Sequence, residues 1–557
     1  MVKALQYADP SAQDTACPRM PLHNPHVLRI LQLLAYYLAT VCLAYPWLNP
    51  LHLGPSVTVF SGLVAWWGAA GLALCFVTLL TRREARWRVL LIGWALAAGV
   101  SAVMGLLQYF DKTQDFWPWI NYAGLGQAFG NLRQRNQFAT LCSIGLVVMW
   151  WWAQHAQAGW AGGLRAWQRT ALLITLAGAA ALVCAASAAS SSRTGFLQLM
   201  LLCLLAWWWR GSANETYLRF RGLQLVGLMV LVYILAAIWL PIAVGADGSV
   251  FERMRESPDG CTSRVALYRN VLYLITQKPI MGWGLGELDF AHFMTLYTTP
   301  LAGVRFCAIL DNAHNLPLHL AVELGLPFAL LICTLLLLWL LRNKPWSEQV
   351  PQRQLAWGLL AMVGLHSLLE YPLWYGPFQV TTVLALWILH SYRLQPSYRV
   401  ITESEPNPPI VKSAEAGQGV RLSTALLGVA MLALVCSLLS WNYWRMSQLY
   451  TPAEKRAPAY RDDTFGKVQG TWFFSGHVDF AVLSVTPVTD QTASNILELG
   501  EQLLHFSPEA KVVEKILDAA LILGGDDKLA LYTPRFAAAF PEDYQRWREA
   551  HPEIKLP

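Results

Sequence analysis

Charged residues are scarce in this sequence, because Asp, Glu, Lys and Arg make up 14% of its 557 residues, against roughly 25% in an ordinary soluble protein. Hydrophobic residues make up 55%, and the mean hydropathy is +0.37. There is no nucleotide-binding loop, no Asp-rich cluster with metal-ligand spacing, no Gly-x-Ser-x-Gly nucleophile elbow and no nucleic-acid-binding motif. These absences argue against a soluble enzyme, against nucleotide-driven chemistry and against a nucleic-acid partner.

Long apolar runs separated by short polar loops are the main feature instead. Tryptophan is abundant, at 26 residues, and runs such as Trp150–Trp152 close apolar stretches, as in membrane-interface belts. Ordinary aromatic core packing is the alternative. Runs long enough, or nearly so, to cross a ~30 Å hydrocarbon layer as helices occur at about 28–48, 57–80, 89–109, 137–153, 170–188, 195–209, 222–244, 315–341, 354–370, 376–390 and 421–441. The sequence therefore predicts an all-α polytopic membrane protein with about 11 transmembrane helices.

The distribution of Lys and Arg predicts the orientation of these helices. Every second short loop is basic, and such loops face the cytoplasm; one of them carries Arg82, Arg83, Arg86 and Arg88. Residues 1–27 lack an apolar signal core with a cleavage site, which favours an uncleaved anchor. We therefore expect a cytoplasmic segment at 1–27, a transmembrane domain at 28–441 with a long periplasmic loop at 245–313, and a small periplasmic helical domain at 442–557.

Two cysteines differ from the rest, which are mostly scattered through apolar runs and behave there as small hydrophobic residues. Cys261 and Cys307 both fall in the predicted periplasmic loop, an oxidising compartment. A disulfide between them would close a long loop and stabilise it by about 4 kcal/mol in the chain-entropy model. Two free thiols remain the alternative.

Ionisable groups at the external ends of apolar helices are candidates for function, because inserting one costs roughly 2.5–3.5 kcal/mol. Each has a purely structural alternative, such as a helix cap, a snorkelling arginine or a buried pair. Arg264 and Tyr268 share one helical face, and His366 and Glu370 have the same i,i+4 spacing. The remaining candidates are Arg133 and Asn136 in the 130–137 segment, Arg193 in the polar island 190–195, and Asp311, His314 and Asn315 in the 311–315 segment.

These segments together resemble the PglL-type protein O-oligosaccharyltransferases (protein glycosylation ligases) of the O-antigen ligase and Wzy polymerase superfamily. The resemblance spans about residues 25–390 and rests on five motifs in order: GNLRQRNQ at 130–137, SSRTG at 191–195, the Arg264 helix ending in PIMGWG at 279–284, DNAHN at 311–315 and HSLLEYPLWY at 366–375. Arg135 departs from the pattern, since relatives are expected to carry a smaller residue or proline there.

The resemblance implies a glycosyltransferase in the bacterial inner membrane with its active site facing the periplasm. It implies that Arg193 and Arg264 bind the pyrophosphate of an undecaprenyl-pyrophosphate-linked glycan and that His314 is essential. No cofactor and no metal are implied, and the acceptor is a periplasmic protein such as pilin. Ligation to lipid A core, Wzy-type polymerisation, a lipid-linked-sugar flippase and a scaffold that docks pili remain alternatives.

The predicted orientation can be tested with a reporter enzyme that is active only in the periplasm. Fused after residue 442, the reporter should be active, because the basic loops alternate along the chain. The same reporter fused in the basic loop at residues 82–88 serves as the control and should be inactive. A cytoplasm-specific reporter that is active at residue 442 would overturn the predicted number of spans.

Overall fold

The computed structural model describes residues 25–155, 165–212, 216–245, 260–392 and 414–552. Every regular element in these ranges is a helix. The prediction of an all-α polytopic membrane protein is therefore confirmed. Most of the predicted N-terminal segment 1–27 lies outside the described residues.

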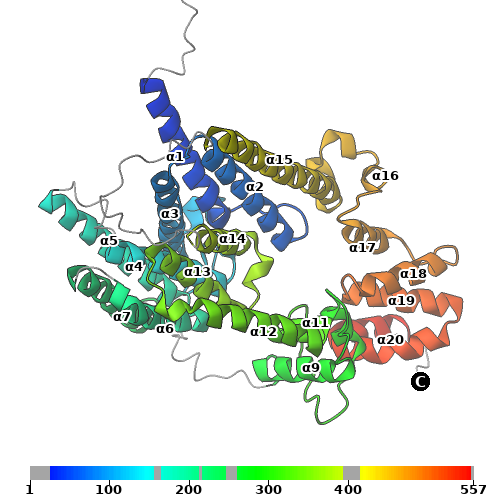
Figure 1. Ribbon diagram of the computed structural model, residues 1–557. Helices are drawn as coiled ribbons and strands as arrows, with labels where there is room; N and C mark the ends of the chain where they lie inside the picture. The colour runs from blue at the N-terminus through cyan, green and yellow to red at the C-terminus, as the bar shows by residue number, and fades with distance from the viewer. Residues whose placement is uncertain (1–24, 156–164, 213–215, 246–259, 393–413, 553–557) are drawn as a thin grey trace, which may run out of the picture.

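Seven helices in the described part of the chain are long and apolar enough to cross a membrane. They correspond to seven of the eleven predicted spans and form much of the bundle in Figure 1. They are α1 (Pro25–Leu48), α2 (Val57–Thr78), α3 (Arg83–Tyr109), α5 (Ala166–Ala189), α7 (Thr216–Val244), α12 (Leu326–Asn343) and α15 (Ala414–Ser447).

The other four predicted spans are also helices, but they do not meet both requirements for a candidate span. Three are too short, namely α6 (Arg193–Trp208), α13 (Pro351–Ser367) and α14 (Gly376–Ser391). The fourth, α4 (Arg135–His155), has 21 residues but is more polar, with Gln137, Thr140 and Ser143 buried along it. Because α4 packs against α3, α5, α6, α7 and α13, its side chains face protein and need not be apolar.

One predicted span is wrong in its extent. The run 315–341 is not one helix, because the chain breaks at Gly325 between α11 (Leu316–Leu324) and α12. Gly325 has a φ of 86°, and a Cβ there would lie 2.0 Å from the backbone oxygen of Ile280. Only glycine fits this close backbone approach. The membrane-crossing part therefore begins at Leu326, and α11 belongs to the external segment that precedes it.

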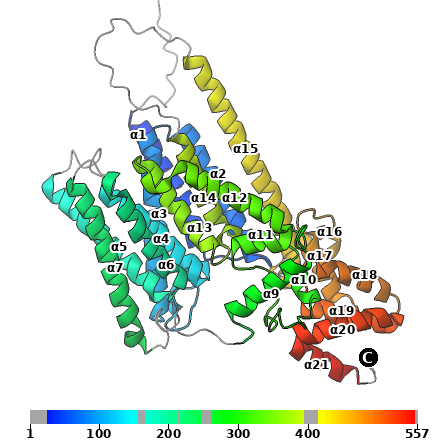
Figure 2. The ribbon, with the colours of Figure 1, turned by 60° about the horizontal axis from the view of Figure 1, so that its bottom comes forward.

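The external segment and the C-terminal helices pack together at one end of the bundle, beside the end of α15 (Figure 2). The external segment contains α9 (Arg264–Gln277), α10 (Leu288–Met294) and α11. The C-terminal part contains α16 (Thr464–Val468), α17 (Ser475–Val485), α18 (Ala493–Leu504), α19 (Ala510–Leu523), α20 (Asp526–Ala539) and α21 (Pro541–Ala550). The predicted boundary at residue 442 falls inside α15, which continues to Ser447.

A shared core joins these two parts. Phe293 of α10 is buried among Val513, Ile516 and Phe536 of α19 and α20. In addition, Arg535 of α20 donates to the backbone oxygen of Met294, at 2.9 Å. The C-terminal helices thus support the external segment that carries several of the predicted functional residues.

Cys261 and Cys307 form a disulfide in the structure, with their Cα atoms 5.2 Å apart. Cys261 lies three residues before Arg264, and Cys307 lies seven residues before His314. The backbone N–H of Cys307 also donates to the oxygen of Cys261, at 3.2 Å. The cross-link therefore ties the start of α9 to the irregular segment leading to His314.

Peptide mapping without reduction, on protein from an oxidising envelope, should recover one peptide that contains both Cys261 and Cys307. Since the cross-link closes a loop with a sequence separation of 46, its loss should lower stability by about 4 kcal/mol in the chain-entropy model. Recovery of both residues as free thiols would show that the bond is not formed.

Candidate active site

Three helix starts place the predicted functional residues. Ser192 caps α6 by accepting from the backbone N–H of Gly195, at 3.1 Å, and Ser263 caps α9 by accepting from that of Ala266, also at 3.1 Å. Arg193 and Arg264 are the residues that directly follow these caps. Asn315 caps α11, and His314 directly precedes it. Ser and Asn at these positions satisfy N–H groups that would otherwise lack partners, so each functional residue sits at a fixed point of the backbone.

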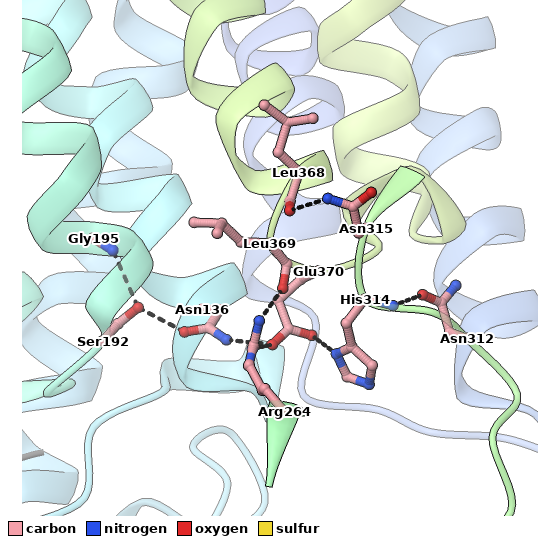
Figure 3. Close-up of polar contacts among 10 residues, drawn as sticks. All are labelled: Asn136, Ser192, Gly195, Arg264, Asn312, His314, Asn315, Leu368, Leu369 and Glu370. Carbon is pink, nitrogen blue, oxygen red and sulfur yellow. Dashed lines mark hydrogen bonds and ion pairs between the residues drawn. The ribbon is translucent and has the colours of Figure 1, made fainter. Parts of the chain in front are cut away.

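The buried carboxylate of Glu370 joins these segments (Figure 3). Its Oε1 accepts from Arg264 Nη2 and from Asn136 Nδ2, the latter at 3.0 Å. Its Oε2 lies 2.6 Å from Nδ1 of His314. Burial favours the neutral acid, but the hydrogen bond and charge of His314 together with the charge of Arg264 outweigh it and lower the pKa of Glu370 below its usual value. Glu370 is therefore an anion at neutral pH.

This contact orients His314. Because an anionic carboxylate only accepts hydrogen bonds, Nδ1 of His314 carries a proton in this contact, and Nε2 is the ring nitrogen left for another partner. The backbone of His314 is in the left-handed region, with φ 49°, and its N–H donates to Asn312 Oδ1 at 2.7 Å. The ring edge also packs against Tyr371, with centroids 5.2 Å apart. A bulky residue held in this sparsely populated conformation is typical of functional sites.

A cavity of 1020 Å³ lies on the Arg264 side of this network. Its wall includes the N-terminal ends of both α6 and α9, through Ser192, Arg193, Ser263 and Arg264. The partial positive charge of a helix N-terminus and the N–H groups there attract anions. Further lining residues are Arg133, Arg135, Asn136 and Tyr268. The cavity thus combines four arginines with two helix N-termini, which suits a phosphate group.

The structure brings most of the predicted residues to this site. Asn136 connects the cap of α6 to Glu370, because its amide oxygen accepts from Ser192 Oγ at 2.7 Å while its Nδ2 donates to Glu370. Asn315 Nδ2 donates to the backbone oxygen of Leu368, at 3.0 Å. Tyr268 lies one turn after Arg264 on the cavity wall, as the i,i+4 spacing predicted. Asp311 is exposed beside this group.

The side chains of His366 and Glu370 do not form the pair that their spacing suggested. The i,i+4 geometry requires a continuous helix, and α13 ends at Ser367. His366 is fully buried in the bundle, and its Nδ1 lies 2.9 Å from Thr140 Oγ1. Glu370 turns instead toward Arg264 and His314.

Several residues of the site have no distinctive sequence signal. Ser192 connects the cap of α6 to Asn136, and Gln198 connects Thr140 to the backbone oxygen of Met362. Ser192 lies in the segment 190–195, in which the sequence pointed only to Arg193. Thr140 and Gln198 lie in apolar helices. Burying a polar side chain there costs free energy and is a signal, but the sequence does not predict the partner of that side chain.

Three family models match the chain. A model described as O-antigen ligase matches residues 178–333, one described as protein glycosylation ligase matches 128–153, and one described as the C-terminal part of virulence factor membrane-bound polymerase matches 354–555. No curated protein and no solved structure matches the chain.

Residues 178–333 are similar to the O-antigen ligase family, and the two other matched segments are similar to a protein glycosylation ligase and to a membrane-bound polymerase. The chain is a membrane glycosyltransferase. The contacts of Glu370 connect all three matched segments of this glycosyltransferase. Asn136 lies in the segment 128–153, Arg264 and His314 lie in 178–333, and Glu370 lies in 354–555. The family therefore implies a lipid-linked glycan donor for a cavity that already has the charge to hold a phosphate.

Replacing Glu370 with Gln tests whether the carboxylate determines which ring nitrogen of His314 carries the proton. A Gln amide turned toward His314 would donate to Nδ1, so the imidazole would carry its proton on Nε2 and lose its acceptor there. We expect glycan transfer to fall about 10²–10⁴-fold, the usual contribution of general-base catalysis, at unchanged expression.

The matched control is Glu348→Gln, which removes the same charge from an ion pair with Arg353. Activity of the control should stay near that of the unmutated protein. Equal activities of the Glu370→Gln and Glu348→Gln variants would show that Glu370 does not set the state of His314.

Proposed function

We propose that this glycosyltransferase transfers a glycan en bloc from undecaprenyl pyrophosphate to Ser or Thr hydroxyls of periplasmic proteins such as pilin. In this proposal the enzyme is a multi-pass protein of the bacterial inner membrane, and the described cavity opens to the periplasm. The match of residues 128–153 to a protein glycosylation ligase supports a protein acceptor, because this segment contributes Arg133, Arg135 and Asn136 to the cavity.

The observation that carries the proposal is that Glu370 contacts both Arg264, on the wall of the cationic cavity, and the oriented ring of His314. Arg193 and Arg264, each at the first turn of a helix, bind the diphosphate of the donor. Negative charge grows on the diphosphate as it leaves, so donors fixed in place there stabilise the transition state by about 3 kcal/mol each. Arg133 and Asn136 also line this cavity.

The reaction is a direct displacement at the anomeric carbon. The acceptor oxygen forms a bond to C1 of the first sugar while the bond from C1 to the phosphate oxygen breaks. His314 Nε2 takes the hydroxyl proton, and the diphosphate leaves with the electron pair. Glu370 stabilises the imidazolium that forms, which is the part that a carboxylate plays beside a catalytic histidine.

Two further acceptors have support from the comparisons. The match of residues 354–555 to a membrane-bound polymerase favours a second glycan as acceptor, and the O-antigen ligase match favours a lipid-anchored one. Incubating purified enzyme with lipid-linked glycan and a Ser-containing peptide, a free glycan or a lipid A core acceptor, in parallel, distinguishes the three. A flippase would form no product with any of them.

Replacing Arg193, Arg264 or His314 with Ala should affect different steps. Loss of either arginine removes charge from the diphosphate, so donor binding and transfer should both fall. Lys should rescue only in part, because an ammonium lacks the planar fork of guanidinium. Loss of His314 leaves the arginines in place, so the donor should still bind while transfer falls about 10²–10⁴-fold.

The measurement is donor binding in parallel with glycopeptide formation, at equal expression of the three variants. Lys278→Ala is the control, since Lys278 lies outside the cavity and its ammonium sits over the ring of Trp283. Transfer at the unmutated rate by His314→Ala would remove its catalytic role. Loss of donor binding in that variant would make His314 a diphosphate ligand instead.

A further inference from the structure

The turn between α9 and α10 presents unusually exposed apolar side chains. Ile280 is 70% exposed, Met281 81% and Leu285 79%, which places all three among the most exposed large apolar side chains in the described part of the chain. Single exposed apolar residues are common on soluble surfaces. Three of them within the eight residues Pro279–Gly286 mark a surface that meets an apolar partner.

Backbone contacts fix this turn firmly on the break between α11 and α12. Leu326 N–H donates to the oxygen of Pro279 at 2.8 Å, and the N–H groups of Trp283 and Gly284 donate to the oxygens of Val322 and Glu323, each at 2.9 Å. Gly282, with φ 68°, lets the two backbones touch, because a Cβ there would lie 2.2 Å from the Glu323 oxygen. The apolar side chains are therefore exposed on a turn whose backbone is held in place by hydrogen bonds.

The neighbour of this turn is α12, which together with α15 is the least buried of the seven candidate membrane-spanning helices in the described part of the chain. α12 begins at Leu326, the residue bonded to Pro279, and only 6% of its most apolar window is buried inside the protein. Leu330 and Leu331, one turn further along α12, are exposed as well. The turn thus lies at the start of a helix that is long and apolar enough to cross a membrane.

The polar residues of the turn have the character of a membrane interface. Trp283 donates from Nε1 to the backbone oxygen of Leu274 at 3.0 Å, and the ammonium of Lys278 lies 4.1 Å from the centre of its ring. Tryptophan and lysine are enriched at the level of the lipid headgroups, where an apolar body and a polar end are both accommodated.

We propose that the Pro279–Gly286 turn inserts Ile280, Met281 and Leu285 into the bilayer leaflet at the outer end of α12. The occupant of this surface is phospholipid, and Lys278 and Trp283 mark the headgroup level. Because α9 leads directly into the turn, insertion holds α9 against the membrane surface. Arg264, at the other end of α9, is then kept at a constant height above the bilayer in which a lipid-linked donor is anchored.

Fluorescence quenching in nanodiscs tests this placement directly. Met281→Cys and Leu285→Cys are each labelled with bimane, in nanodiscs of ordinary phospholipid or of phospholipid brominated near the start of its acyl chains. The control is Ile522→Cys, since Ile522 is an exposed apolar residue at the end of α19, which packs on α18 and α20. Unmutated protein treated in the same way gives the background labelling.

Bromination should reduce the bimane signal at residues 281 and 285 several-fold more than at residue 522. Equal quenching at the three positions would overturn the proposal. A second variant asks whether the apolar side chains drive insertion: Ile280→Ser with Met281→Ser should abolish quenching of a label at residue 285. Persistent quenching there would also overturn it. Neither measurement depends on glycan transfer, so both stand apart from the proposed function.

Discussion

The arrangement of the site depends on one buried carboxylate. Glu370 accepts from Arg264, Asn136 and His314, which belong to three segments far apart in the sequence. A buried carboxylate is costly unless it is paired and hydrogen-bonded, so its burial is itself a constraint: the three partners must be in place for the region to be stable. The same contacts therefore stabilise this region and orient His314.

One covalent bond and one apolar contact hold the segment that carries Arg264 and His314 in place. The disulfide between Cys261 and Cys307 holds the start of α9 close to the segment that leads to His314. Phe293 anchors the external segment in the core of the C-terminal helices. Each support acts on the part of the chain between α4, which bears Asn136, and Glu370, which follows α13. Arg264 and His314 of the external segment are thereby held in contact with Glu370, which follows α13 of the bundle.

Much of this was predictable from the sequence, and the failures have specific causes. Hydrophobic runs predicted the helices, and spacing placed Arg264 and Tyr268 on one face, because both inferences use only local geometry. The pairing of His366 with Glu370 failed since α13 ends between them. The break at Gly325 was missed because it depends on the backbone of Ile280, and the contacts of Asn136 with Ser192 and Glu370 join residues that no local pattern relates.

The remaining question is how Arg264 can hold Glu370 and an anionic donor together. A guanidinium has five N–H donors in a rigid fork, and the bonds to Glu370 and to the backbone oxygen of Leu369 use one donor on each of its two terminal nitrogens. Three donors remain, and the side chain is 44% exposed on the cavity wall. Arg264 can therefore bind phosphate without releasing Glu370, so His314 keeps its orientation as the donor binds. Lysine has one nitrogen and cannot present donors in these two directions with fixed geometry.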